Sequence, residues 1–448
     1  MATEVNRYRL YCQTESDYVY KWDTVPPTKC VNDISHTVDS NTVTIIDTVS
    51  TTYVSIMDIA KTQYQEVGHG NKNIIMNFKG LFGKTRLRDN FVVQGTADII
   101  NNVGTSTEYQ LLTIETTDKA NMRSIENIPY YGHCTNEACL GIRIPQTLTN
   151  NQYIQFGIYN DSNGFYFKYT SSGIGIGYRV NGTDSNFTQS NLNIDTLNSN
   201  GLSSIVYQPS KSQMYGIRIS GIGSKIIDYG IYSKSKYGDQ RFALMHRIHT
   251  NDLGNSIQSL NTSLPFSTEI CNNGTSGSNN VFLSDRTYGI FGDYNDKYTD
   301  MRQSSVYVSG IVVNSSDTFV PIASIRKKGY FETMNVYLSS IDTIASTPQI
   351  IQISSGSTLT NPYWQAVSGQ SPTETAIEYD ESASILSNDG VVIWTGYVSA
   401  GKTTLNWNNY GGILPKCILN GILPITISTH NGSSNGTLGL VIRTAEDW

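Results

Sequence analysis

Apolar and polar residues alternate along much of this chain, most clearly over residues 151–181 (NQYIQFGIYNDSNGFYFKYTSSGIGIGYRVN). A strand places successive residues on opposite faces, and the two sets at its start are Ile154, Phe156 and Ile158 against Gln155, Gly157 and Tyr159. Turn-forming Asn, Asp, Ser and Gly separate the runs at 160–164 and 171–173. The pattern predicts three antiparallel strands with an apolar face that a second sheet covers, as in a β-sandwich.

The same alternation recurs in three blocks, and we expect a domain in each. Residues 1–62 predict a small N-terminal β-module, 63–304 a central jelly-roll or lectin-like sandwich, and 305–448 a C-terminal β-sandwich. A long turn-rich excursion is expected at 181–204. Strands outside the opening stretch are expected at 8–12, 18–22, 92–100, 108–117, 215–219, 225–232, 241–249, 305–313, 318–326, 333–345, 391–400, 422–428 and 436–444.

Composition supports an all-β, multidomain chain. Only 15% of its 448 residues are charged, and Tyr alone numbers 29. Uncharged polar, β-branched and aromatic residues favour strands and turns over helices. The net charge is −6 without a basic cluster, so we expect no nucleic-acid partner. No apolar run approaches the ~20 residues of a membrane span, and the first residues lack the apolar core of a signal peptide.

Six cysteines are too few for a disulfide scaffold. Cys12 and Cys30 could face each other across a hairpin, and His133, Cys134 and Cys139 could form half of a zinc site. No second ligand pair lies nearby in sequence, so reduced thiols are favoured. We therefore expect no metal site and no cofactor, and leave open whether Cys12–Cys30 or Cys134–Cys139 is bridged.

Three short motifs invite a catalytic interpretation, and we expect each to be structural. The glycines of 173–177 lie inside a strand pattern, where they relieve crowding, rather than in a phosphate loop. The Gly-x-Ser-x-Gly match at 432–436 leads into a strand-like run, whereas a nucleophile elbow needs a helix. His246 and His249 would point to opposite faces of a strand, one toward the core and one toward solvent.

A pair of carboxylates is all that many glycan-cleaving enzymes need. The central block offers several in turns, where such side chains usually bond their own backbone: Asp161, Asp184, Asp195, Asp228 and Glu269. Residues 293–296 resemble part of a calcium loop without its glycine and distal glutamate. We expect no catalytic residues, while a paired role for the carboxylates stays an alternative.

Exposed aromatic rings are a separate candidate, because they can stack on the apolar face of a sugar. Tyr363, Trp364 and Trp407 are the candidate glycan-binding residues, with Tyr130 and Tyr131 as a further place. Packing or a subunit contact is the alternative for each of them. Trp394, within an apolar run, is expected in the core. Glycosylation is left open at Asn181, Asn186, Asn273 and Asn431.

Four segments in order resemble a domain that recurs in structural proteins of large DNA viruses and tailed phages. They are RSIENIPY at 123–130, GIYNDSNGFYFKY at 157–169, QSNLNIDTLNSNGLSS at 189–204, and the stretch 245–270 with its His-x-x-His and Leu-Pro-x-x-x-Glu-Ile ending. The opening YRLYCQTE…VYKWD…PPTKC…HTVD resembles a module of other viral structural proteins. The sequence departs from the family at Leu192, where the family has tryptophan.

The resemblance implies a virion component, made in a host cytoplasm, with a lectin-like jelly roll at its centre. It brings no catalytic residues. The expected function is a capsid-associated, tail or fibre component that acts by multivalent assembly, with other virion proteins as partners and a host-surface glycan as a further ligand. Low charge and apolar C-terminal strands favour a homo-oligomer, a trimer first. The alternatives are a glycan-binding receptor module and a tail-associated polysaccharide depolymerase.

Overall fold

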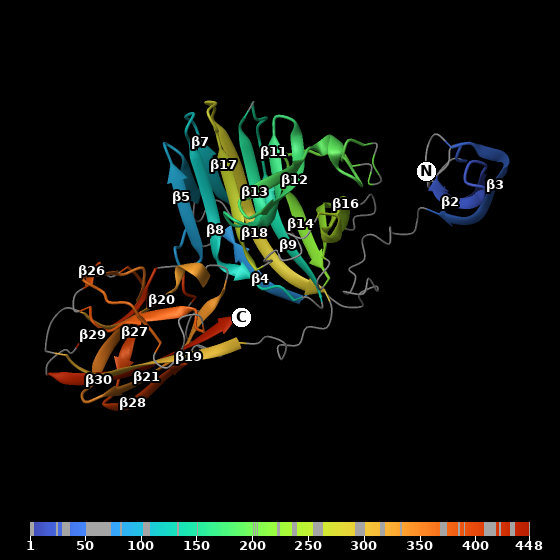
Figure 1. Ribbon diagram of the computed structural model, residues 1–448. Helices are drawn as coiled ribbons and strands as arrows, with labels where there is room; N and C mark the ends of the chain where they lie inside the picture. Colours follow the sequence, from blue (N-terminus) through green and yellow to red (C-terminus); the bar gives the residue numbers. More distant parts are fainter. Residues whose placement is uncertain are drawn as a thin grey trace. The chain divides into compact units, whose positions relative to one another are not determined.

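The computed structural model describes residues 4–23, 26–28, 36–50, 73–80, 83–101, 108–131, 134–149, 151–199, 201, 203, 205–221, 225–234, 240–253, 263–291, 301–313, 319–331, 334–367, 374–383, 386–388, 390–406, 418–420, 423–430 and 435–447. Their regular structure is antiparallel β-sheet with a few short 3₁₀ turns and no α-helix. No helix among these residues is long and apolar enough to cross a membrane. The all-β, multidomain class expected from the sequence is confirmed (Figure 1).

The N-terminal module is a three-stranded sheet in the order β2-β1-β3. Its strands are β1 Glu4–Cys12, β2 Asp17–Asp23 and β3 Val38–Ser50. The two strands expected at 8–12 and 18–22 are therefore present and paired with each other. Tyr8, Leu10 and Cys12 are among its buried apolar side chains. Contacts divide the chain after Ala60, so this module is a compact unit of its own.

Two sheets form the central sandwich. The first has seven strands in the order β13-β12-β11-β10-β17-β8-β5, and the second has the order β16-β15-β14-β9-β18-β7-β6, with β4 paired to β18. The strands are β4 Asn73–Lys79, β5 Asp89–Gln94, β6 Asp98–Asn101, β7 Tyr109–Thr113, β8 Lys119–Ile128, β9 Thr135–Arg143, β10 Tyr153–Tyr159, β11 Gly164–Thr170, β12 Gly173–Val180, β13 Thr183–Phe187, β14 Gln213–Ser220, β15 Ile226–Lys234, β16 Gln240–His249, β17 Leu264–Cys271 and β18 Asn279–Phe291. Figure 1 shows β11 and β12 beside each other in the first sheet.

Alternation along the predicted meander decides which side chains enter the core. Ile154, Phe156 and Ile158 belong to the buried cluster between the sheets, as their parity predicts. Phe156 lies 4.7 Å, ring centre to ring centre, from Tyr215 of the opposite sheet. Full burial of a large apolar side chain stabilises the folded state by about 1.5–3 kcal/mol. The three strands of residues 151–181 are therefore confirmed in place and in facing.

The glycines of β12 have the structural role expected of them. A Cβ on Gly175 would collide with the carbonyl oxygen of Phe187, and one on Gly177 with the ring of Tyr166. Only a residue without a side chain lets β13 and the Tyr166 ring approach the strand this closely. The Gly-x-Gly-x-Gly run is thus part of a sheet and not a phosphate-binding loop.

The excursion at 181–204 contains a strand that the sequence did not predict. Asn181 and Gly182 have φ angles of 50° and 79° and form a tight turn, so that β13 folds back along β12. Asn-Gly is the residue pair that such hairpin turns favour. Its strand, Thr-Asp-Ser-Asn-Phe, lacks apolar alternation because an edge strand needs only backbone hydrogen bonds on one side. The turn-rich excursion thus begins with one additional strand.

The C-terminal strands form a four-stranded sheet, β19-β30-β21-β28, and a six-stranded sheet, β24-β25-β20-β29-β22-β27, with the pair β23-β26 beside them. The strands are β19 Met301–Val313, β20 Val320–Lys327, β21 Val336–Ala345, β22 Gln349–Ser355, β23 Thr358–Leu359, β24 Gln365–Ala366, β25 Ile377–Asp380, β26 Leu386–Asn388, β27 Val391–Val398, β28 Gly401–Asn406, β29 Ile425–His430 and β30 Gly436–Asp447. Ile325, Ile341 and Ile442 lie in their shared core. β19 begins four residues before the expected boundary at 305.

Candidate functional site

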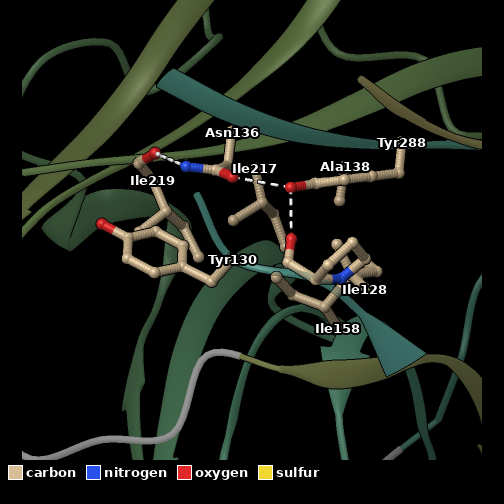
Figure 2. A pocket seen from close by; sticks show the side chains of 9 residues that line it. Ile128, Tyr130, Asn136, Ala138, Ile158, Ile217, Ile219 and Tyr288 are labelled. Carbon is tan, nitrogen blue, oxygen red and sulfur yellow. Dashed lines mark hydrogen bonds between the residues drawn. The ribbon is translucent and has the colours of Figure 1, made fainter. Parts of the chain in front are cut away.

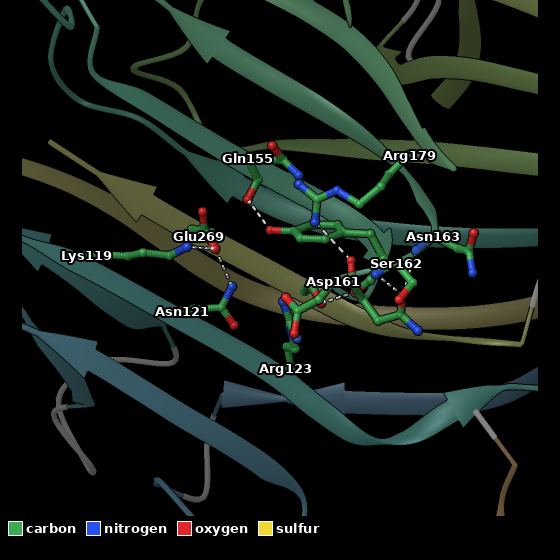
Figure 3. Close-up of polar contacts among 12 residues, drawn as sticks. Lys119, Asn121, Arg123, Gln155, Asp161, Ser162, Asn163, Arg179 and Glu269 are labelled. Carbon is green, nitrogen blue, oxygen red and sulfur yellow. Dashed lines mark hydrogen bonds and ion pairs between the residues drawn. The ribbon is translucent and has the colours of Figure 1, made fainter. Parts of the chain in front are cut away.

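The seven-stranded sheet carries polar and charged side chains on the face that points away from the sandwich core. We call this set the polar face, and it consists of Lys119, Asn121 and Arg123 of β8, Tyr153, Gln155 and Tyr159 of β10, Tyr166 and Lys168 of β11, Arg179 of β12, Asp184 and Asn186 of β13, Glu269 of β17, and Asp161 of the β10–β11 turn. Their neighbours in sequence, such as Ala120, Phe167 and Ile270, are in the core cluster. Strand alternation therefore places the set on one surface. Figure 3 shows part of it, around Glu269, Arg123 and Arg179.

Glu269 is the centre of a hydrogen-bond network on the polar face. Its carboxylate accepts bonds from Tyr153 Oη at 2.7 Å and Asn121 Nδ2 at 2.7 Å, and pairs with Lys119 Nζ at 3.0 Å. The side chain is only 9% exposed, so a charge there needs these partners. Burial, together with the neighbouring carboxylate, raises the pKa of Tyr153. The phenol is therefore held as a hydrogen-bond donor.

Two arginine–carboxylate pairs lie beside that network. Arg123 donates two bonds to Asp161, at 3.0 and 2.5 Å, and Arg179 donates two to Asp184, at 2.6 and 3.1 Å. The bonds from Arg123 lower the pKa of Asp161. Arg179 also lies over the ring of Tyr159, with 5.6 Å between the guanidinium carbon and the ring centre. Bidentate pairs of this kind hold both partners in one geometry.

Lys168 differs from the other cations of the polar face. Its Nζ lies 4.9 Å from the centre of the Tyr153 ring. Across the part of the chain that the structure describes, no hydrogen bond or ion pair of this ammonium group is found. Partial burial lowers the pKa of Lys168, because it removes part of the water around the ammonium group. A ligand acceptor would therefore regain for Lys168 the hydrogen bonds that solvent supplied.

A small hollow lies next to Lys168. It encloses about 50 Å³, and Gly173, Gly175, Asn186 and Gln189 are among its other lining residues. A Cβ on Gly173 would collide with the Gln189 side chain, and one on Gly175 with the carbonyl oxygen of Phe187. Residues with amide, hydroxyl and ammonium groups line the hollow. Such hydrogen-bonding groups suit a polar ligand.

A second hollow in the sandwich is smaller, and polar groups that line it are hydrogen-bonded to the protein. It measures about 10 Å³, and Tyr130, Asn136 and Tyr288 line it together with aliphatic side chains (Figure 2). Asn136 Nδ2 donates to the carbonyl oxygens of Tyr131 and Cys134 at 2.8 and 3.0 Å. The hydroxyl of Tyr288 donates to Asn136 Oδ1 at 2.6 Å. A space of this size holds a single water at most.

Each of the five carboxylates that the sequence singled out has a partner of its own. Asp161 and Asp184 pair with arginines and Glu269 is bound as described above, while Asp228 pairs with Arg247 at 2.6 Å. Asp195 accepts bonds from the backbone N–H groups of Leu197 and Ser203, as expected of a turn residue. A general acid needs a raised pKa, whereas that of Asp161 is lowered. The paired catalytic alternative gains no support from this geometry.

The two histidines of β16 take the positions expected of them. His246 is 4% exposed and its Nδ1 accepts a bond from the backbone N–H of Asn193 at 3.1 Å. His249, at the end of the strand, is exposed. The prediction that they cannot share one metal ion agrees with this arrangement.

The aromatic candidates for glycan stacking differ in exposure where the structure describes them. Tyr363 is 69% exposed, whereas Trp364 is half-buried and has the guanidinium of Arg326 over its ring at 4.0 Å. The hydroxyl of Tyr130 donates to the carbonyl oxygen of Gly221, so this ring is packed. Trp394, expected in the core, is half-buried against it. A glycan-binding role of Tyr363 and Trp364 stays a prediction.

Cys12, Cys134 and Cys139 are buried, and Cys271 is half-buried. Cys134 lies in the core cluster, whereas Cys139, an odd number of residues away along the chain, falls on the opposite face of β9. This facing separates the two thiols and agrees with the expectation of reduced cysteines. Several predictions fall outside the described residues, namely those on Cys30, His133, Trp407, Asn431, residues 293–296 and residues 432–434. β30, which follows that last motif, is a strand as expected.

Sequence reasoning missed most of the polar face, although part of the signal was present. Lys119, Asn121 and Arg123 alternate with Ala120 and Met122, which is the pattern of a strand with one polar side. The sequence could not show that this strand lies beside β17 with its Glu269. That neighbourhood follows from the sheet order, which the register between β8 and β17 establishes.

No protein-family model matches the sequence, and no curated protein matches it. Among solved structures, a protein of unknown function from Shewanella oneidensis MR-1 is similar at 8% identity, with a TM-score of 0.31 over 49% of this chain and 87% of that one. Peanut lectin with a nonamer peptide is similar at 10% identity, with a TM-score of 0.28 over 50% of this chain and 100% of that one. Lectin I-B4 from Griffonia simplicifolia is similar at 11% identity, with a TM-score of 0.29 over 48% and 99%. Likenesses this low carry no argument about what the chain binds.

Proposed function

We propose that the central sandwich binds a carbohydrate on its polar face, with the hollow beside Lys168 as the point of contact. The observation that carries the proposal is a partly buried cation for which no hydrogen bond is found among the described residues, next to a hollow lined by amides and hydroxyls. A site that leaves such a donor facing a hollow is prepared for an acceptor from a ligand.

The remaining polar face supports a sugar in preference to an apolar ligand. Sugar hydroxyls both donate and accept, and the network around Glu269 offers fixed groups of both kinds. Fixed polar partners select ligands by hydrogen bonding because a ligand without the matching group leaves them unpaired. The rings of Tyr159 and Tyr166 are buried and in contact with each other. Recognition on this face therefore relies on hydrogen bonds rather than on ring stacking.

A glycan array probed with the full chain tests the proposal. Lys168→Ala removes the ammonium group and is expected to weaken binding about tenfold or more, since hydrogen bonds to charged groups contribute about 1.5–3 kcal/mol. Tyr363→Ala is the matched variant for the C-terminal prediction. Loss of binding in the Lys168 variant alone supports the polar face, and loss in the Tyr363 variant alone overturns it. Absence of binding to every glycan also overturns the proposal.

The proposed role is binding without cleavage. The carboxylates of the polar face are each occupied by arginine, lysine, tyrosine or asparagine. Incubation of the chain with each glycan that it binds is expected to release no reducing ends. Release that disappears in a Glu269→Gln variant would instead establish the depolymerase alternative.

A virion role is a separate proposal, and it rests on the sequence resemblance of four segments to viral structural proteins. It is compatible with glycan binding, because attachment to a host surface gains strength from many copies. The proposal expects the chain at fixed stoichiometry in purified particles, and as an oligomer, a trimer first, by sedimentation. A chain absent from particles, or a monomer at high concentration, would contradict it.

A further inference from the structure

Three side chains that bind metals meet at one end of the N-terminal sheet. Cys12 is the last residue of β1, Glu15 lies in the turn to β2, and His36 precedes β3. β1 is the middle strand, and Cys12 is paired with Asp17 on one side and Val38 on the other. The register therefore brings the turn and the segment before β3 to the same end. A thiol, a carboxylate and an imidazole result, with their ligand atoms all within 4.8 Å of one another.

The distances within this cluster match those around a single tetrahedral ion. His36 Nδ1 lies 3.1 Å from Glu15 Oε1 and 3.8 Å from Cys12 Sγ. With the usual zinc bond lengths, tetrahedral geometry separates a nitrogen and an oxygen ligand by about 3.3 Å, and a nitrogen and a sulfur ligand by about 3.6 Å. Both distances at His36 agree to within a few tenths of an ångström. The same nitrogen atom faces both other ligands, as it would across one shared ion.

The chemistry of the three ligands selects zinc. Thiolate favours zinc over magnesium and calcium, and imidazole and carboxylate complete ligand sets that zinc accepts. Cys12 is fully buried, whereas the side chains of His36 and Glu15 are 25% and 27% exposed. The thiol thus lies on the inner side of the cluster, and solvent reaches the outer side. A water molecule can occupy the fourth position there.

The module also has a physical need for such an ion. It forms a compact unit of about sixty residues by itself, and the buried apolar side chains among its described residues include Tyr8, Leu10, Cys12 and Pro27. Domains of this size bury too little surface for a stable core and commonly depend on a metal or on disulfides. We propose that Cys12, Glu15 and His36 bind one zinc ion, which ties the turn and the start of β3 to the end of β1.

Zinc binding by the full-length chain tests the proposal. The chain is stripped with a chelator, titrated with zinc alone, and its bound metal is measured by mass spectrometry after dialysis. One zinc per chain is expected. His36→Ala is expected to lower the affinity on the order of a hundredfold, since even outer partners of a metal site change it by 10–100-fold. Glu15→Gln is expected to weaken it less, because an amide oxygen is a poorer ligand.

Two surface variants serve as matched controls. His249→Ala removes an exposed histidine and Cys271→Ser a partly exposed cysteine, and neither is expected to change the zinc content. Cobalt in place of zinc reports the thiolate directly, through a sulfur-to-metal absorption band that Cys12→Ser should abolish. If Cys12→Ser does not fold, the cobalt absorption band of the wild-type chain and the His36→Ala variant still decide the question. His36 is partly exposed, so its replacement is expected to leave the fold intact.

Three results would overturn the proposal. The first is a chain that retains no zinc. The second is a chain that binds zinc equally well in the His36→Ala and Glu15→Gln forms, because the ion would then lie elsewhere. The third is a disulfide between Cys12 and Cys30 in the purified chain, detected by mass spectrometry of peptides, because a bridged sulfur is not available as a thiolate.

Discussion

Acidification should weaken the central sandwich at His246. Its Nδ1 accepts the backbone N–H of Asn193 at 3.1 Å, and its ring lies 4.8 Å, centre to centre, from that of Phe187. Only the neutral imidazole can accept this bond, and burial lowers the pKa of His246 from 6.5 to about 4. In the unfolded chain the histidine binds a proton near pH 6.5, whereas in the folded chain it does so only near pH 4. Stability is therefore complete above pH 6.5 and falls as the pH falls.

The magnitude follows from the two pKa values. Their difference of about 2.5 pH units corresponds to about 3 kcal/mol, at about 1.36 kcal/mol per unit. About 2 kcal/mol of this is lost by pH 5, and below pH 4 the loss levels off because both states then bind the proton. Few single groups supply so large a share of a domain's stability.

Hydrogen exchange measured by mass spectrometry is the suitable assay, because it reports each segment separately in a chain of several domains. Peptides from β16 and from residues 189–197 are compared at pH 7 and pH 5, after correction for the intrinsic exchange rate. In the wild-type chain, the free energy of opening derived from exchange of these peptides should be about 2 kcal/mol lower at pH 5 than at pH 7. His246→Asn, which does not titrate, should lose much less, and His249→Asn should behave as wild type. Equal losses in the wild type and His246→Asn would refute the reasoning, as would an imidazole pKa above 6 by NMR.

Three other predictions address the core, the sheet and the proposed ligand. The Phe156 ring is fully buried and in contact with Tyr215. Phe156→Ala should therefore lower the free energy of unfolding of the sandwich by about 3–5 kcal/mol, measured by urea unfolding with tyrosine fluorescence. A decrease below about 1 kcal/mol would mean that the ring is not in the core. Gly175→Ala should cost about 1–3 kcal/mol and abolish glycan binding, because its Cβ collides with Phe187 and displaces β13; unchanged melting and binding would contradict this. Lys168→Ala should weaken the binding of glycans that carry a carboxylate about tenfold more than the binding of neutral glycans, because only the former pair with the ammonium group. Equal effects on both classes would contradict this pairing.

The parity of the meander could be predicted because it depends on local chemistry. Apolar residues at every second position cannot all be buried unless the chain is extended, so Ile154, Phe156 and Ile158 enter the core. The facing of Gly175 was predictable for the same reason. β13 was not, because Thr183–Phe187 carries no apolar alternation and depends on the Asn181–Gly182 turn and on backbone pairing. The turn residues were the available signal.

A site whose residues meet only through the register between two paired strands cannot be predicted from local sequence patterns. Asn121 meets Glu269 across 148 positions of the sequence, and the two are opposite one another because β8 pairs with β17 in one particular register. A shift by one residue would turn Glu269 toward the core and its neighbours Thr268 and Ile270 toward the polar face. The cost of burying that carboxylate without partners makes such a shift unfavourable. The network that forms the candidate site is thus also a reason why the register of the sheet is unique.

The same argument applies to the aromatic residues, because local patterns do not show which side chains pack against their rings. Tryptophan and tyrosine beside turns suggested a stacking platform at Tyr363 and Trp364, yet Arg326 already covers the Trp364 ring. On the polar face, Tyr159 and Tyr166 are buried on the outer side of a sheet, where Arg179 lies over Tyr159. Their rings support the arginine, and the arginine holds Asp184. Tyr159 therefore supports a polar network as well as a sheet, and in the proposed glycan site Lys168 is the cation for which that network supplies no hydrogen bond among the described residues.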